Sequence, residues 1–286
     1  ILPISGSQFA IEQIPQLLSA GSVAAPVWGY AEHSYRWQLA GHQLYWYSSY
    51  QELADLVETN TVNNAVVINP NNPSTELFSL PELQQILAAL RTKNGKLLVD
   101  EAFIDSSDEH SLCRLLQGQP CPNGLIILRS VGKFFGLAGI RLGFVIANEA
   151  FIQRLEPQLS PWAVNHIARW VGRHALADRD WHRRQCQRLV QDSMAWQGQL
   201  KSLFPAFDWQ RSDYFVTAFA DRQSCEKLYQ QLAQCALLVR LLWSAREGLQ
   251  STSGNGNGNG DGDGNGISKN GNDGNGNGND GNGKIL

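Results

Sequence analysis

Short apolar runs alternate with helix-forming stretches along the first 250 residues, and this alternation limits the possible folds more than any other feature. Each run is rich in Leu or β-branched residues and is bounded by polar residues or Gly, which is typical of buried strands. The runs are Ala65–Asn69, Lys96–Asp100, Leu125–Arg129 and Gly143–Ala147. A helical stretch from Leu80 to Lys93 separates the first two and ends at Asn94-Gly95. The alternation predicts βαβ units and an α/β fold with a mostly parallel sheet.

The pattern becomes mainly helical from about Phe151 and is clearly helical between 184 and 203. A candidate strand at 214–219 and a candidate helix near 225–235 then begin what we interpret as a second, smaller domain. We therefore predict a large domain at 1–150, connecting helices at 151–205, a partial small domain at 206–250 and a disordered tail at 251–286.

The tail consists almost entirely of Gly, Asn and Asp and has no apolar periodicity. It cannot bury enough surface to offset its ordering entropy, so we expect disorder. The segment Asp261–Gly266 looks like the start of a calcium loop, but Asn272 stands where the bidentate Glu is required. We therefore expect no bound metal.

Composition excludes some classes of partner and indicates a cellular compartment. With 286 residues and 43% hydrophobic content the chain can bury a sizeable core, and its net charge of −3 gives no reason to expect nucleic acid or an acidic membrane. No apolar run reaches the roughly 20 residues that span a bilayer. Five cysteines without a CxxC pair favour reduced thiols in a cytoplasmic protein. Ile1 opens what we predict to be a strand, so we expect that the natural N-terminus is missing.

Polar residues follow three of the predicted strands, where an open parallel sheet binds ligands at its C-terminal edge. Singly they are weak signals, because an Asp after a strand is more often a helix cap and a lone Lys is usually solvated. Their order and spacing make the set specific, because it supplies an amide, a carboxylate, a hydroxyl, an amine and a guanidinium to one crevice. These residues are Asn72, Asp100, Ser130, Lys133 and Arg141.

This constellation resembles the fold-type I pyridoxal-phosphate family, which includes the aspartate and histidinol-phosphate aminotransferases, over about residues 2–239. The resemblance implies a seven-stranded-type sheet sandwiched by helices, pyridoxal 5'-phosphate as cofactor, and a homodimer. It also implies that Lys133 holds the cofactor as a Schiff base and that Asp100 pairs with the pyridinium nitrogen. Asn72 would then hydrogen-bond the phenolic oxygen O3', while Ser130 and Arg141 would hold the phosphate. A carboxylate at the ring nitrogen keeps the ring an electron sink, and an arginine matches a phosphate with two donors.

The N-terminal region adds two candidate cofactor contacts. Gly6, Ser7 and Gln8 precede an apolar-periodic helix, and N–H groups at a helix start favour an anion; the family binds the cofactor phosphate at this turn. An ordinary Ser N-cap is the alternative. Tyr30 occupies the position of the aromatic ring that stacks on the pyridine in the family, with a core or surface aromatic as the alternative. For His33 we favour a structural or surface role over one in the site.

Details within the motifs suggest a reaction. Phe103 stands where aminotransferases of this type commonly carry a tyrosine. Together with several other segments, it makes the chain look like the threonine-phosphate decarboxylases of cobalamin biosynthesis. That group decarboxylates L-threonine O-3-phosphate, a phosphorylated amino acid, to (R)-1-amino-2-propanol phosphate, and by the resemblance Lys133 and Asp100 are the catalytic residues. The other segments are Ser5–Gln8, Gly29–His33, Ala40–His42, Lys133–Phe144 and Pro161–Asn165.

Two alternatives stay open, an aminotransferase of the histidinol-phosphate type and a truncated, inactive copy. The family grips the substrate carboxylate with a late arginine, and neither Arg240 nor Arg246 can be matched to it. The family's N-terminal arm is also missing. We therefore hypothesise that the chain as given holds the cofactor poorly or not at all and is inactive.

Overall fold

The computed structural model describes residues 1–242 and the backbone of 282–285. They form two compact units. One comprises residues 1–205 with 209–217, and the other comprises 206–208 with the described residues from 218 onward. The helices between 151 and 205 therefore belong to the first unit, which also contains every candidate site residue.

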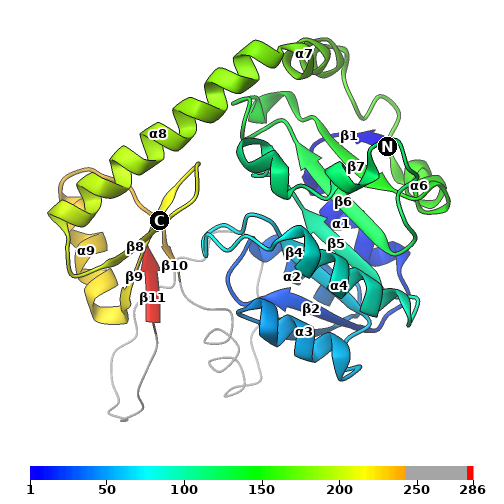
Figure 1. Ribbon diagram of the computed structural model, residues 1–286, viewed down its shortest axis with the longest axis horizontal. Helices are drawn as coiled ribbons and strands as arrows, with labels where there is room; N and C mark the ends of the chain where they lie inside the picture. Colours follow the sequence, from blue (N-terminus) through cyan, green and yellow to red (C-terminus); the bar gives the residue numbers. More distant parts are fainter. Residues whose placement is uncertain (243–281, 286) are drawn as a thin grey trace, which may run out of the picture. The chain divides into compact units, whose positions relative to one another are not determined.

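A seven-stranded sheet forms the centre of the first unit (Figure 1). Its strand order is β1-β7-β6-β5-β4-β2-β3, and strands β2 to β6 pair in parallel. Strand β7 is antiparallel to both of its neighbours, β6 and β1. The prediction of a mostly parallel, seven-stranded α/β sheet is thus confirmed. The strands are β1 Leu2–Ile4, β2 Ser22–Pro26, β3 Gln43–Tyr47, β4 Asn64–Ile68, β5 Lys96–Asp100, β6 Leu125–Ser130 and β7 Gly143–Ala147.

Helices cover both faces of this sheet because successive strand residues point to opposite sides. Val67 and Val99 pack with the apolar faces of α3 and α4, whereas Val66 and Leu98 pack with α1, α2 and α6 on the other side. Burial on both faces explains why the strands are continuous apolar runs. The helices are α1 Ser7–Leu17, α2 Ala31–Leu39, α3 Tyr50–Glu58, α4 Leu80–Arg91, α5 Cys113–Leu116 and α6 Glu149–Leu155, with 3-10 turns η1 Asp105–His110, η2 Ala138–Ile140 and η3 Glu156–Gln158.

The predicted elements agree closely with the observed ones where sequence signals are strong. Helix α4 begins in a capping box, in which Ser79 and Glu82 satisfy each other's backbone N–H groups, and it ends two residues before the predicted boundary. The helical region before residue 205 consists of α7 His166–Ala177 and α8 Arg179–Leu203. In contrast, β2, β3, α2 and α3 were not predicted as elements. Strand β2 is short, Ala-rich and ends at Pro26, so it lacks a β-branched run.

The second sheet has the order β10-β11-β9-β8. Its elements are β8 Asp208–Arg211, β9 Val216–Asp221, α9 Arg222–Gln234, β10 Leu241–Leu242 and β11 Asn282–Ile285. Strand β11 pairs antiparallel with β9, so four residues of the expected disordered tail form a strand. The disorder prediction for residues 251–281, and the calcium-like loop within it, lie outside the described residues. Across residues 1–242, no helix combines the length and apolarity that crossing a membrane requires.

Candidate active site

Strands β4, β5 and β6 pair in parallel, so the residues that follow them meet at one edge of the sheet. The backbone ties these ends together, because Asn69 N donates to Asp100 O at 2.8 Å and Glu101 N donates to Leu128 O at 2.9 Å. The structure therefore places Asp100 between the Asn72 loop and the strand that leads to Ser130 and Lys133.

Asp100 is buried and oriented by two hydrogen bonds. Its Oδ2 lies 2.9 Å from Nε2 of His33, and the side chains are 7% and 2% exposed. Its Oδ1 accepts a hydrogen bond from Ala102 N at 3.0 Å. The other nitrogen of His33, Nδ1, is buried and has no hydrogen-bond partner among the described residues. A buried carboxylate held in this way can keep a ring nitrogen protonated beside it.

His33, for which the sequence favoured a structural or surface role, lies against Asp100 in the structure. It lies on α2, three residues after Tyr30, and the two rings meet edge to face with centroids 6.3 Å apart. Residues three apart on a helix share a face, which was the one available signal. That signal alone could not show that Asp100, 67 residues later, would lie against the imidazole.

The Gly6–Ser7 turn lies against Arg141. Helix α1 begins at Ser7, and a Cβ built on Gly6 would lie only 2.6 Å from Nη2 of Arg141. Gly6 also has a φ of 81°, so only glycine fits this approach without strain. Among the described residues Arg141 has no carboxylate partner, and its Nη1 donates to Ala138 O at 3.1 Å. A helix start beside an unpaired guanidinium is an arrangement that suits a phosphate.

Gln8 and Tyr30 are joined to each other. The Tyr30 hydroxyl donates to Gln8 Oε1 at 3.2 Å, while Gln8 Nε2 donates to Glu12 and Glu32. The Gln8 side chain is therefore engaged between α1 and α2, so its backbone is the part that remains for an anion. Tyr30 is 51% exposed, and partial burial together with the negative charge of Glu32 raises the pKa of its hydroxyl.

Lys133 is exposed and carries a free amine. Its Nζ lies 5.3 Å from the centroid of the Phe103 ring, and no described residue hydrogen-bonds it or pairs with its charge. Two aromatic residues after it anchor the loop, because Phe134 packs on His182 at 4.5 Å between centroids and Phe135 stacks on Trp181 at 5.5 Å. The loop thus fixes the backbone of Lys133 and leaves its amine available for chemistry.

The Asn72 and Ser130 side chains both keep hydrogen-bonding groups that no described residue engages. Asn72 is half-buried, and no described residue hydrogen-bonds its side chain. The neighbouring Asn71 instead donates to Trp28 O and to Ser74 Oγ. Ser130 Oγ accepts a hydrogen bond from Gly132 N at 3.1 Å, which leaves its hydroxyl proton free to donate. Both groups are thus available to a ligand.

A second charged cluster begins at the residue after Asp100. Glu101 is fully buried and accepts hydrogen bonds from Ser111 Oγ at 2.6 Å and Leu112 N at 2.8 Å. Arg129 lies 3.4 Å from Glu101 and 2.7 Å from Asp105. Burial raises the pKa of both carboxyl groups, although the charge of Arg129 acts to lower it. The two carboxylate charges in turn hold the pKa of Arg129 above its ordinary value despite its own burial. This cluster was not anticipated from the sequence.

The fold and these residues together define a class: an α/β protein with a carboxylate, a lysine and an anion cup at the carboxyl edge of its sheet. Residues 1–243 match the family described as aminotransferase class I and II. The chain belongs to this family, whose cofactor is pyridoxal 5'-phosphate, as its solved structural neighbours in complex with that cofactor illustrate. The predictions of family, fold and cofactor are therefore confirmed.

Individual relatives carry two kinds of name. A threonine-phosphate decarboxylase from Pseudomonas aeruginosa is 38% identical over 248 residues, which covers 84% of this chain and 70% of the relative. A second, from a Sinorhizobium species, is 38% identical over 167 residues, covering 57% of this chain and 47% of the relative. A histidinol-phosphate aminotransferase from Thermotoga neapolitana is 31% identical over 186 residues, covering 65% of this chain and 52% of the relative. The chain thus spans about half the length of the last two.

Solved structures agree on the fold. The histidinol-phosphate aminotransferase from Clostridium acetobutylicum superposes with a TM-score of 0.73 at 21% identity, covering 84% of this chain and 73% of that one. The L-threonine-O-3-phosphate decarboxylase from Porphyromonas gingivalis superposes with a TM-score of 0.65 at 20% identity, covering 84% and 74%. Identities this low show the shared fold and do not distinguish the two reactions.

Proposed function

We propose that the chain is the cofactor-binding part of a pyridoxal-phosphate-dependent lyase. It decarboxylates L-threonine O-3-phosphate to (R)-1-amino-2-propanol phosphate in cobalamin biosynthesis. The observation that carries the proposal is the 38% identity to a threonine-phosphate decarboxylase over 84% of the chain. The geometry adds support, because Asp100 and Lys133 follow neighbouring strands of that matched region. A cytoplasmic homodimer is part of the same proposal.

The bound cofactor supplies an electron sink for the pair released when carbon dioxide leaves. Asp100 provides the buried negative charge for the pyridinium nitrogen, and His33 fixes the carboxylate at 2.9 Å. Gly6, Ser7 and Ser130 offer N–H and hydroxyl donors to the phosphate, beside the Arg141 guanidinium. Tyr30 would cover the ring face, and the Asn72 amide would donate to O3'.

Lys133 has two roles in this proposal. Its amine would hold the cofactor between turnovers and, once freed by the substrate amine, would return a proton to Cα. A lysine needs an amine that no carboxylate engages for both roles. No described carboxylate pairs with Lys133, so its amine is available for these roles.

Phe103 favours decarboxylation over amino transfer. Its ring lies under the Lys133 amine and carries no hydroxyl that could hydrogen-bond the cofactor or assist a proton shuttle. The aminotransferase alternative is kept because a histidinol-phosphate aminotransferase is also a relative, at 31% identity. An assay separates them: carbon dioxide release from threonine phosphate supports the lyase, and amino transfer dependent on 2-oxoglutarate supports the alternative.

Cofactor binding is tested first, on the chain as printed. The protein is mixed with pyridoxal phosphate and its visible absorbance is scanned, alongside Lys133→Ala and the control Lys201→Ala on α8. A visible band that is present in the unmodified chain and the control but lost in Lys133→Ala supports the site. A band that persists in Lys133→Ala assigns the wrong lysine. No band in the unmodified chain means that this chain does not hold the cofactor, in agreement with the truncation hypothesis.

A further inference from the structure

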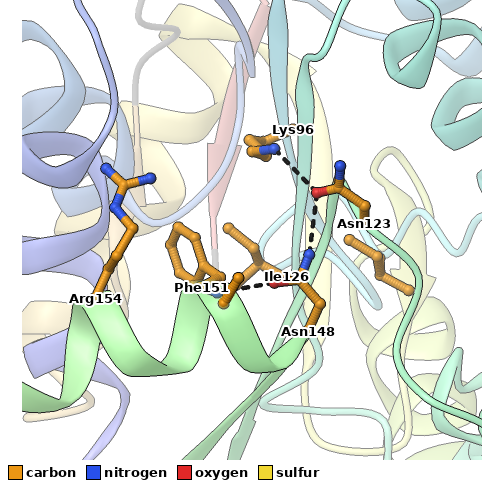
Figure 2. Close-up of a pocket in the computed structure, with 9 residues that line it drawn as sticks. Lys96, Asn123, Ile126, Asn148, Phe151 and Arg154 are labelled. Carbon is orange, nitrogen blue, oxygen red and sulfur yellow. Dashed lines mark hydrogen bonds between the residues drawn. The ribbon is translucent and has the colours of Figure 1, made fainter.

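Two cavities lie at the opposite edge of the first unit's sheet, where β5 and β6 begin. One has a volume of about 100 Å³ and the other of about 360 Å³, and Lys96 and Arg154 line both of them. Figure 2 shows the smaller cavity. Lys96 begins β5, and the strand ends at Asp100. At 3.3 Å per residue the two ends are roughly 13 Å apart, so these cavities are distinct from the candidate cofactor site.

The linings are one-sided in charge. They contain three cationic side chains and five asparagines, and neither contains an Asp or a Glu. The chain as a whole has more acidic than basic residues, 26 against 23, so chance does not favour a cation-only lining. Across residues 1–242, no carboxylate lies within ion-pair distance of Lys96 or Arg154.

The hydrogen bonds leave donors available. Asn148 is fixed, because its Oδ1 caps Phe151 N at 2.8 Å and its Nδ2 donates to Asn123 Oδ1 at 3.0 Å (Figure 2). Lys96 Nζ reaches the same oxygen at 3.4 Å, a long contact that leaves most of the ammonium's hydrogen-bonding capacity unused. The Asn123 amide nitrogen has no partner among the described residues.

Arg154 and Lys93 differ in how far they are committed. Arg154 donates one Nη2 hydrogen bond to Leu17 O, and its other guanidinium nitrogens have no described partner. Lys93 lines the larger cavity, but its amine donates to Val57 O and Val62 O. Two cations, Lys96 and Arg154, are therefore left to meet a ligand.

The positive charges of Lys96 and Arg154 also repel each other. Partial burial, followed by the nearby charge of Arg154, lowers the pKa of the Lys96 ammonium. An anion between the two would remove that repulsion and accept charge-assisted hydrogen bonds from both.

We infer that Lys96, Arg154 and Asn123 form a binding site for the phosphate group of a small anion, separate from the cofactor site. A phosphate offers several acceptor oxygens at once, which matches an ammonium, a guanidinium fork and an amide donor arranged around one cavity. This inference does not rest on the proposed reaction.

Inorganic phosphate is the probe, titrated calorimetrically into the cofactor-treated chain at constant ionic strength maintained with chloride. Three proteins are compared: the unmodified chain, the double variant Lys96→Gln/Arg154→Gln, and Arg141→Gln, which alters the cofactor phosphate cup instead. We expect saturable binding that weakens at least tenfold in the double variant and persists in Arg141→Gln. Absence of saturable binding, equal binding by the double variant, or loss only in Arg141→Gln overturns the inference.

A local measurement keeps the test decisive if the double variant does not fold. The unmodified chain is acetylated briefly with and without phosphate, and the labelled lysines are quantified by mass spectrometry. We expect phosphate to slow labelling of Lys96 several-fold and to leave the exposed Lys201 unchanged. Equal slowing of both lysines, or of neither, contradicts a site at Lys96.

Discussion

Asp100 and Glu101 are neighbours at the end of β5, yet they lie in two different electrostatic environments. Asp100 meets one imidazole and one backbone N–H group, at the edge where the candidate cofactor residues gather. Glu101 is fully buried with Ser111 and Leu112 N, and it shares Arg129 with Asp105. Successive residues after a strand diverge, so two adjacent carboxylates can serve different ends. We infer that Asp100 serves the cofactor and Glu101 serves the fold.

Removing Arg129 tests the structural role of the Glu101 cluster, and it has the largest expected effect. Arg129→Met leaves two buried carboxylates without their shared cation, and breaking a buried pair costs about 3–5 kcal/mol in the free energy of unfolding. Urea unfolding measures this cost. Arg114→Met is the control, because its pair with Asp108 is half-exposed and at 3.8 Å, and such pairs contribute about 0–1 kcal/mol. Equal losses for the two variants would contradict a structural role for the Glu101 cluster.

Replacing each carboxylate with its amide separates the role of Asp100 from that of Glu101. Asp100→Asn removes a charged hydrogen-bond partner of the cofactor, a loss of about 1.5–3 kcal/mol, which weakens cofactor affinity about 10- to 100-fold. Its unfolding free energy should change less than that of Arg129→Met, because the amide keeps the shape of the side chain and can still accept the hydrogen bond from Ala102 N.

Glu101→Gln should show the reverse, with lower stability and unchanged affinity. Absorbance titration with pyridoxal phosphate and urea unfolding are measured on both variants. The same pattern in both would mean that the neighbours share one role.

The two buried histidines, His33 and His42, test the role of Asp100 further, with a smaller expected loss of cofactor affinity. His33 and His42 are 2% and 4% exposed, and the Nδ1 atom of each has no hydrogen-bond partner among the described residues. Of the two, His33 is the one that contacts Asp100. His33→Gln loosens that carboxylate, and losing one hydrogen bond of about 0.5–1.5 kcal/mol should weaken cofactor affinity about 2- to 10-fold. His42→Gln, whose Nε2 meets Pro15 O, should lower stability only. If His42→Gln weakens the cofactor as much, His33 has no specific role.

Sequence could predict strands β4 to β7 and the residues at their ends because both depend on local patterns. A buried strand needs a continuous apolar run, and β5, β6 and β7 each have one. The roles of Asp100, Lys133 and Arg141 came from their order along the chain and from a family resemblance. These roles remain predictions, while the structure places the residues at one sheet edge.

The remainder could not be predicted because it depends on contacts between residues distant in sequence. His33 meets Asp100 across 67 positions, and Arg129 meets Glu101 across 28. The motif Asp100-Glu101 contains two carboxylates and no local sign of which one faces the site. The cation-only cavities are equally invisible, because Lys96 and Arg154 are 58 residues apart.

Acidification provides the smallest expected effect and tests the sign of the Glu101 cluster's energetics. Burial raises the pKa of Glu101 and of Asp105 above their ordinary values of 4.5 and 3.8, so the folded state binds protons that the unfolded state has released. Between the unfolded and the folded pKa values, the free energy of unfolding therefore falls as pH rises. Lowering the pH from 7 into that window should favour the unmodified chain relative to Glu101→Gln, which keeps Asp105 but lacks the Glu101 carboxyl group. Urea unfolding of both proteins across the window measures the difference, and a gap that does not change with pH would mean that Arg129 fully neutralises Glu101.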